Sequence, residues 1–226
     1  MAAAARRRRR DRLGTAPRTR VAPFRRRLVI MAKAPIAGAV KTRLAREVGS
    51  VAATGFARHA AAALFARLGH DRRWQTSIAV TPDPSAASWL WPMGAVIIGQ
   101  GRGDLGQRMQ RLADRVPLGP LVIVGTDIPK IAPQHIATAF ARLGSCEAVF
   151  GPAADGGYWL VGLRRRPRRL TPFRRVRWSS AQALSDTVAN LTGRSIAMLA
   201  TLTDIDSAET LAAHAAGFAR RVRPPA

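Results

Sequence analysis

The stretch LVIMAKAPIAGAVKTRL, residues 28–44, joins a short apolar run to a charged loop and then to the start of a helical pattern. Residues 28–32 predict a buried strand because they are apolar, few in number and followed by loop signals. A helix is predicted from residue 43 onward. This order of strand, loop and helix decides the fold class, because it recurs along the rest of the chain.

The chain alternates short apolar runs, which predict strands, with periodic patterns, which predict helices. This alternation predicts an α/β sandwich with a mostly parallel sheet, in which ligands bind beyond the carboxyl ends of the strands. The predicted strands span residues 28–32, 76–80, 95–98, 121–124, 148–150 and 158–161, and the predicted helices span 43–47, 51–68, 104–116, 133–143, 181–191 and 207–215.

The net charge of +24 lies mainly in two segments of the sequence. Residues 1–27 contain eleven arginines and one aspartate, and residues 164–177 contain eight arginines and no acidic residue. Such basic segments are typical of proteins that bind nucleic acids, so this class is one alternative function. Few aromatic side chains interrupt these arginines for stacking on bases, and we therefore expect no specific nucleic-acid partner.

The composition predicts a globular protein without a membrane span. Hydrophobic residues make up 47% of the chain, and its apolar runs are too short to cross a bilayer. We expect a basic, disordered extension over residues 1–27, a single domain over 28–218 and a basic tail over 219–226. Cys146 is the only cysteine, which excludes an intrachain disulfide and favours a cytoplasmic location. The sequence predicts no particular oligomeric state.

The loop after the first predicted strand has the composition of a phosphate site. It carries Lys33, Lys41 and Arg43, and Gly38 allows the backbone to approach a ligand closely. Backbone N–H groups at the start of the following helix favour an anion. The loop is not a Walker A motif, since Val40 stands where that motif requires glycine. The alternative is an ordinary turn with solvated cations.

The segment QGRGDLGQRM, residues 100–109, contains a G-x-G-x-x-G pattern between a predicted strand and a predicted helix. This pattern is found in dinucleotide-binding folds, although there it follows the first strand rather than the third. A glycine-rich helix start with Asp104 as the N-cap is the alternative. Both interpretations remain open on the sequence.

Two acidic positions predict a divalent metal site. Asp127, in VIVGTDIP, follows a predicted strand, and Mg²⁺ is commonly bound by one or two carboxylates together with substrate phosphates. Asp206, in LTDIDSAETL, precedes a predicted helix that Ser207 can cap, and a role as second metal ligand would explain it. A turn or cap aspartate is the alternative at Asp127.

Two further segments are candidates for contact with a second substrate. In GPAADGGYWL, Asp155 precedes the adjacent Gly156 and Gly157, which indicate backbone pressed against a ligand or another segment. A hairpin-type turn explains the same residues. In FRRVRWSS, Trp178 is a candidate for the lining of an acceptor pocket, or a core residue before the next helix.

Taken in order, AKAPIAGAVKTRL, QGRGDLGQRM, GTDIP, GPAADGGYWLVGL, Trp178-Ser179 and DIDSAETL resemble a bacterial family of glycosyltransferase-A-type proteins. The family lies in the nucleotide-diphospho-sugar transferase superfamily, and some members are labelled arsenosugar biosynthesis glycosyltransferases. The resemblance covers about residues 28–215. The chain is more distantly similar to the molybdenum-cofactor and 2-phospholactate guanylyltransferases.

The resemblance implies a three-layer α/β/α sandwich with a mostly parallel mixed sheet of the glycosyltransferase-A type. It also implies an enzyme that takes a nucleotide or nucleotide-sugar donor, a small-molecule acceptor and Mg²⁺ or Mn²⁺. The implied roles are as follows: Ala32, Lys33 and Gly38 around base and phosphates, Lys41 and Arg43 on phosphate, Gln100 or Asp104 at the base, Asp127 and Asp206 on the metal, and Asp155, Gly156 and Gly157 at the sugar or acceptor.

The reaction type remains open between two transfers. Glycosyltransferases of this fold usually carry an Asp-x-Asp motif, whereas the strand end here reads Thr126-Asp127-Ile128-Pro129. We expect glycosyl transfer from a nucleotide-sugar, in which Lys41, Asp127 and Asp155 are the candidate catalytic residues. Nucleotidyl transfer to a phosphorylated acceptor is the alternative, and it would require no general base.

Overall fold

The computed structural model describes residues 24–83, 91–203, 209 and 212. The predicted helix over 207–215 and the expected metal ligand Asp206 lie outside these residues, as do most of the basic extension and the whole C-terminal tail. The proposed boundaries of the extension, the domain and the tail therefore stay predictions.

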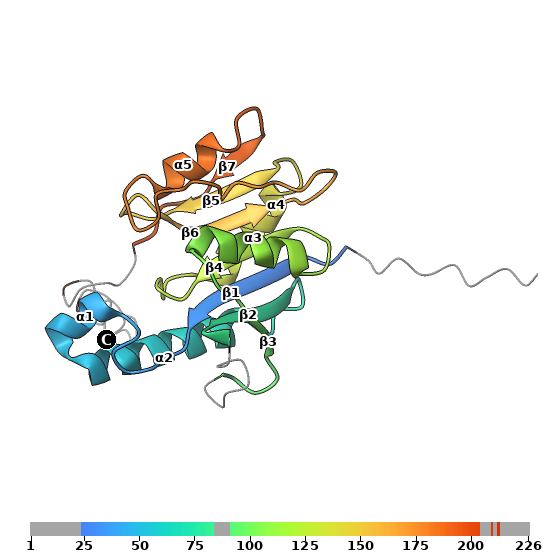
Figure 1. Cartoon of the computed structure of the whole chain (residues 1–226). Coiled ribbons are helices and arrows are strands. Elements are labelled where there is room, and N and C mark those ends of the chain that lie inside the picture. Colours follow the sequence, from blue (N-terminus) through green and yellow to red (C-terminus); the bar gives the residue numbers. More distant parts are fainter. Residues whose placement is uncertain (1–23, 84–90, 204–208, 210–211, 213–226) are drawn as a thin grey trace, which may run out of the picture.

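A seven-stranded mixed sheet forms the middle layer, with strand order β3-β2-β1-β4-β6-β5-β7 (Figure 1). Neighbouring strands are parallel except where β6 pairs with β4 and β5, so β6 alone is reversed among these seven strands. The strands are β1 (Arg27–Lys33), β2 (Gln75–Thr81), β3 (Val96–Gly99), β4 (Leu121–Gly125), β5 (Ala148–Pro152), β6 (Tyr158–Leu163) and β7 (Ile196–Met198).

Helices cover both faces of the sheet, which confirms the three-layer sandwich. Apolar side chains of α2 and α4 pack with those of β1 and β4 in one core, and α3 and α5 pack against the other face. Leu28 and Val29 show the alternation, since each is fully buried in a different core. The helices are α1 (Thr42–Val48), α2 (Ser50–Leu68), α3 (Leu105–Arg115), α4 (Pro133–Arg142) and α5 (Ala183–Ala189).

One helix boundary and one additional strand differ from the sequence prediction for identifiable reasons. Helix α3 begins at Leu105, and Asp104 is its N-cap because its carboxylate accepts a hydrogen bond from the Gln107 N–H at 2.8 Å. Strand β7 was not predicted, since it has three residues, none of them fully buried, and is identified only by its pairing with β5.

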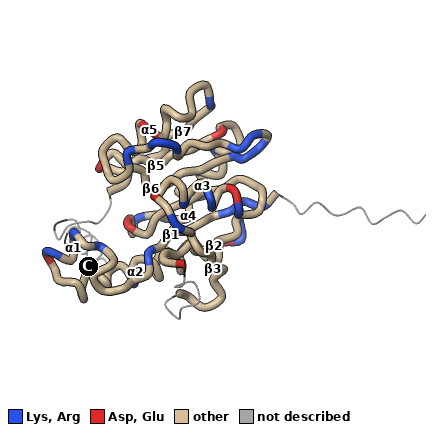
Figure 2. The backbone as a smooth tube through the Cα atoms, viewed as in Figure 1, with Lys and Arg blue, Asp and Glu red and all other residues tan. Residues whose placement is uncertain are grey.

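The charged side chains lie mostly in the loops and helices rather than in the strands (Figure 2). Arg165, in the loop after β6, is unusual because it is buried and donates hydrogen bonds to the carbonyl oxygens of Ala113, Val116, Pro117 and Gly119. Its burial lowers its pKa to about 10. Among the described residues, no helix has the length and apolar character needed to span a membrane.

Candidate active site

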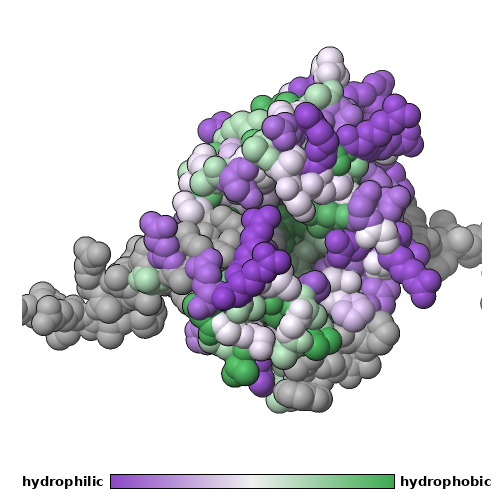
Figure 3. All heavy atoms as spheres, turned by 60° about the vertical axis from the view of Figure 1, so that its left-hand side comes forward, coloured by the Kyte–Doolittle hydropathy of each residue, from purple (hydrophilic) through white to green (hydrophobic). Residues whose placement is uncertain are grey.

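The largest cavity at the carboxyl ends of β1 and β4 is lined by cationic side chains. Its volume is about 610 Å³, and we call it the cationic cavity. Figure 3 brings this end of the sheet forward and shows a hollow with an apolar floor and a hydrophilic rim. The cavity brings together six of the predicted site residues: Ala32, Lys33, Lys41, Arg43, Gln100 and Asp127.

Lys41 and Asp127 form an ion pair in this cavity. The Lys41 Nζ lies 2.7 Å from Asp127 Oδ1, and the side chains are 8% and 60% exposed, respectively. The lysine is therefore held in place by surrounding protein, while the carboxylate faces the open cavity. This arrangement places a positive charge beside the point where β4 ends, although the loop that carries Lys41 and the turn that carries Asp127 are far apart in sequence.

Two cavity residues other than glycine adopt left-handed backbone conformations. Lys41 has φ 47° and Ser179 has φ 58°. Such conformations cost roughly 1–2 kcal/mol for residues with a Cβ, and they concentrate at functional sites. Lys41 is also the N-cap of α1 and makes no side-chain capping bond. Its side chain is thus directed to the cavity and not to the helix end.

Gln100 is only 2% exposed, and both the nitrogen and the oxygen of its side-chain amide are hydrogen-bonded to other protein groups. Its Nε2 donates to the carbonyl oxygens of Ala32 at 3.1 Å and Ala79 at 2.8 Å, which ties β1 to β2. Its Oε1 accepts a hydrogen bond from Arg108 Nη1 at 3.1 Å. Gln100 therefore orients Arg108, a cavity residue that sequence reasoning missed, and its amide is already engaged at the place where a base contact was expected.

A second cavity of about 300 Å³ adjoins the first and is lined by aromatic side chains. We call it the aromatic cavity; Tyr158, Trp159 and Trp178 form its aromatic wall. Both cavities share Asp127, so this carboxylate lies at their junction. No lysine or arginine is among the described residues that line the aromatic cavity, whereas Asp155 adds a second carboxylate.

The turn that carries Asp155 is fixed by its own hydrogen bonds. Asp155 Oδ1 accepts from the Gly157 N–H at 2.9 Å, and both residues line the aromatic cavity. Gly156 has φ 84°, and a Cβ on it would clash with the carbonyl oxygen of Ala181. The predicted close approach at Gly156 is therefore made by another chain segment rather than by the cavity.

Trp178 and Tyr158 are held by packing between α3, α5 and the sheet. Their rings meet edge to face, with centroids 6.3 Å apart. A Cβ on Gly106 would lie 2.7 Å from the Trp178 ring, so glycine is needed at this point in α3. Burial raises the pKa of the Tyr158 hydroxyl, which Thr187 Oγ1 approaches at 3.5 Å. Tyr158 thus serves as a neutral wall residue.

Three predicted site residues are not brought to the cavities. Gly38 has φ 76°, and nothing lies within 4 Å of the position that a Cβ would take. Asp104 caps α3, and Gly156 packs on Ala181. Arg108, Tyr158 and Ser179 line the cavities and were not predicted, although the run from Gln100 to Met109 could have drawn attention to Arg108.

Among the described residues, a divalent cation in the cationic cavity would find one carboxylate, that of Asp127, and not a complete set of protein ligands. The described residues contain no group of three or more His, Cys, Asp or Glu side chains with metal-ligand geometry. Asp127 is exposed, pairs with Lys41 and lines the same cavity as three other cations, which suits a site completed by phosphate oxygens. The expected partner Asp206 is outside the described residues.

Solved structures share this arrangement of sheet and helices. A structure described as a "putative nucleotide-diphospho-sugar transferase" from Desulfovibrio desulfuricans G20 is 26% identical, with a TM-score of 0.73, and the match covers 80% of this chain and 82% of that one. CMP:2-keto-3-deoxy-manno-octonic acid synthetase complexed with CTP is 12% identical, with a TM-score of 0.56 over 88% of this chain and 100% of that one. Molybdopterin-guanine dinucleotide biosynthesis protein A from Archaeoglobus fulgidus is 11% identical, with a TM-score of 0.52 over 86% and 99%.

Fold and cavities together define the class: the chain is an enzyme with the nucleotide-diphospho-sugar transferase fold, as the sequence motifs predicted. No curated protein matches it. Within that class, the chain belongs to the family described as "Uncharacterized protein conserved in bacteria (DUF2064)", whose model matches residues 64–180.

Proposed function

We propose that the chain transfers a glycosyl group from a nucleotide-diphosphate sugar to an acceptor that bears a hydroxyl group and no phosphate. The donor diphosphate would lie in the cationic cavity, and the acceptor would lie in the aromatic cavity. The anomeric carbon would then sit near Asp127, where the two cavities meet.

The single observation that carries this proposal is the unequal charge of the two cavities. Lys33, Lys41, Arg43 and Arg108 line the first, and they suit the two negative charges of a diphosphate. The second shares Asp127, which is paired with Lys41, and adds the carboxylate of Asp155; no cation is among its described lining residues. A phosphorylated acceptor would meet the Asp155 carboxylate there at a cost in electrostatic energy. A neutral sugar or alcohol, with apolar faces against tryptophan, meets no such cost.

In the proposed step, an acceptor oxygen attacks the anomeric carbon while the bond from that carbon to the diphosphate oxygen breaks. The acceptor hydroxyl loses its proton to the Asp155 carboxylate, which is exposed and lines the acceptor side. Lys41 and Arg108 stabilise the negative charge that grows on the leaving diphosphate. Each charge change thus faces a side chain of opposite charge.

Asp127 would hold Mg²⁺ or Mn²⁺ together with diphosphate oxygens. Bound there, the ion would supply further stabilisation of the leaving group. The exposed carboxylate in a cavity lined by four cations fits this role, because those cations would hold the phosphates that complete the ligand set. Asp206 remains the proposed second protein ligand.

A thermal-shift screen separates this proposal from nucleotidyl transfer. UDP-, GDP- and dTDP-sugars are compared with GTP, CTP and UTP, each with and without Mn²⁺. We expect stabilisation by a nucleotide-sugar that depends on Mn²⁺ and disappears in Asp127→Asn but not in Asp114→Asn, an exposed carboxylate outside both cavities. Stabilisation by triphosphates alone would favour nucleotidyl transfer, and a response only to NAD(P) would favour the dinucleotide alternative.

A second variant tests the acceptor side without knowledge of the acceptor. Asp155→Asn keeps an oxygen that can accept the Gly157 hydrogen bond and removes the general base. Slow release of nucleoside diphosphate, with water as acceptor, should fall about 100-fold or more, while the donor dissociation constant stays unchanged. Unaltered release by this variant would argue against Asp155 as the base.

A further inference from the structure

A third cavity lies at the opposite end of the sheet and shares no lining residue with the two cavities of the active site. It has a volume of about 650 Å³ and runs between the first residues of β1 and β2, the edge strand β3 and the last turn of α3. We call it the arginine groove. Its charged lining residues are Arg27, Asp71, Arg72 and Arg115, and His70 also lines it.

The groove exists because helices leave this part of the sheet uncovered. Helix α3 packs over the centre of the sheet, and β3 is an edge strand of four residues. Val96 and Ile98 of β3 therefore form an apolar floor, and Val96 is 59% exposed. Leu112 and Val116 of the α3 end form the facing wall. The result is an apolar surface that a monomeric enzyme does not need for its own core.

Arg27 gives this apolar groove an unsatisfied donor. Its Nε is buried, and no hydrogen-bond acceptor lies within reach of it among the described residues. Buried side-chain donors are nearly always hydrogen-bonded, so the Arg27 guanidinium, which lines the cavity, has hydrogen-bonding capacity that the described protein groups do not use. Burial, and to a lesser extent the positive charge of the neighbouring Arg25, lowers the pKa of Arg27.

The other charges of the groove leave it with an excess of cations. Arg72 and Arg115 are exposed and line it together with Arg27. Asp71 is the carboxylate among the described lining residues, and Arg73 already binds it through hydrogen bonds of 2.6 to 3.1 Å. An incoming anion would therefore meet three guanidinium groups and one carboxylate that is already paired.

We propose that the arginine groove binds an amphipathic anion, with an apolar body on the β3 floor and a carboxylate or phosphate head on Arg27 and Arg115. The apolar floor and wall exclude a fully hydrated ion such as free phosphate as the preferred ligand, and the arginines exclude a neutral lipid. A site at the amino ends of the strands is separate from the transfer site, so its ligand would not be a reactant there.

Isothermal titration of the full chain with three ten-carbon probes tests this proposal. Decanoate and decyl phosphate carry the two candidate head groups, and decanol carries none. We expect saturable binding of one or both anions and at least 10-fold weaker binding of decanol. The tighter anion identifies the head group as carboxylate or phosphate.

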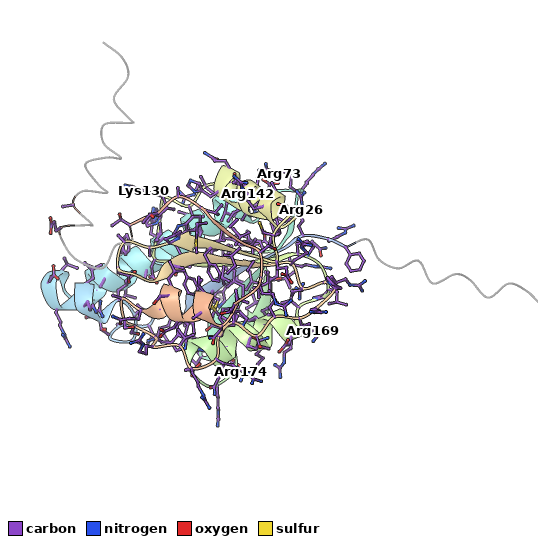
Figure 4. All side chains as sticks on the ribbon, turned by 90° about the horizontal axis from the view of Figure 1, so that it is seen from above. Arg26, Arg73, Lys130, Arg142, Arg169 and Arg174 are labelled. Atoms are coloured by element: carbon purple, nitrogen blue, oxygen red, sulfur yellow. The ribbon has the colours of Figure 1, made fainter. Side chains whose placement is uncertain are left out.

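Variants locate the binding in the groove. Arg27→Gln and Arg115→Gln should each weaken the binding of the anions about 10-fold or more, as expected for loss of a charge-assisted hydrogen bond. Val96→Glu places a carboxylate on an exposed floor position and should abolish binding, so the test stands even where Arg27→Gln does not fold. Arg174→Gln is the matched control, because Arg174 is exposed and is not among the residues that line the groove; Figure 4 shows it on the side of the molecule opposite Arg26 and Arg73.

Three results would overturn the proposal. The first is the absence of saturable binding of either anion to the wild-type chain. The second is decanol binding as tightly as the anions, which would leave no role for the arginines. The third is an equal loss of anion affinity in Arg174→Gln and in the groove variants, which would mean that only the net charge of the protein matters.

Discussion

Replacing Lys41 with methionine should weaken the binding of the nucleotide-sugar without unfolding the enzyme. Methionine keeps most of the buried stem, and the left-handed backbone costs both residues the same. The lost group is an ammonium whose Nζ lies 2.7 Å from Asp127 Oδ1 in a side chain that is 8% exposed. A charge-assisted hydrogen bond from this group to a diphosphate oxygen is worth about 1.5–3 kcal/mol, so the dissociation constant should rise about 10- to 150-fold.

The free energy of unfolding should change far less than the binding energy. Asp127 is 60% exposed, and water can replace the lost partner, so the pair contributes about 1 kcal/mol or less to stability. Calorimetric titration of the best nucleotide-sugar from the screen measures the first effect, and urea unfolding measures the second. Lys130→Met is the matched control, because Lys130 is an exposed lysine that lines neither cavity and is labelled in Figure 4.

Two outcomes would refute this reasoning about Lys41. If Lys41→Met binds the nucleotide-sugar as tightly as the wild type, the lysine does not contact the diphosphate. If Lys130→Met loses as much affinity as Lys41→Met, only the net charge matters. The corresponding nucleoside, which has no phosphate, should bind both variants equally well.

Three further predictions concern Trp178, the turn at Gly156 and the ion pair between Arg177 and Asp186. Gly156→Ala should lower the free energy of unfolding in urea by about 2 kcal/mol or more, because a Cβ would clash with Ala181 and φ is 84°. Trp178→Leu should raise the acceptor concentration at half-maximal rate about 2- to 12-fold, with donor affinity unchanged in titrations. Arg177 lowers the pKa of Asp186 from 3.8 to about 2, so this pair stabilises the fold above about pH 4 and ceases to do so as the pH falls toward 2. The difference in thermal midpoint between wild type and Asp186→Asn should therefore disappear at low pH.

The sheet could be predicted because its central strands are buried on both faces. Parallel strands in such a position are continuous apolar runs, and residues 28–30 of β1 and 121–124 of β4 are nearly inaccessible to solvent. The edge strand β7 has no such run, and it pairs with β5, from which it is separated by a long stretch of the chain. The local sequence therefore contained no signal for it.

The cationic side of the site could also be predicted in part, since charge and loop position are visible in sequence. Gln100 shows where this reasoning stops. Its amide nitrogen donates to the carbonyl oxygens of Ala32 and Ala79, which lie 68 and 21 positions away in the sequence. Such contacts follow from burial in the folded chain. The Arg108 guanidinium is held by this buried amide and by the carbonyl oxygen of Asp104, so its place in the cavity could not be predicted from spacing alone.

The position of the aromatic cavity follows from the direction of a single strand. Strand β6 runs antiparallel to β4, and Val124 pairs with Leu160. The first residues of β6, Tyr158 and Trp159, therefore lie beside the carboxyl end of β4, and the turn before them brings Asp155 close to Asp127. In an all-parallel sheet, the amino end of β6 would lie at the opposite end of the strands. The second carboxylate would then be separated from the first by the length of a strand. Strand direction is absent from local periodicity, so the meeting of both aspartates in one site was implied by the family resemblance and not by the pattern of strands and helices.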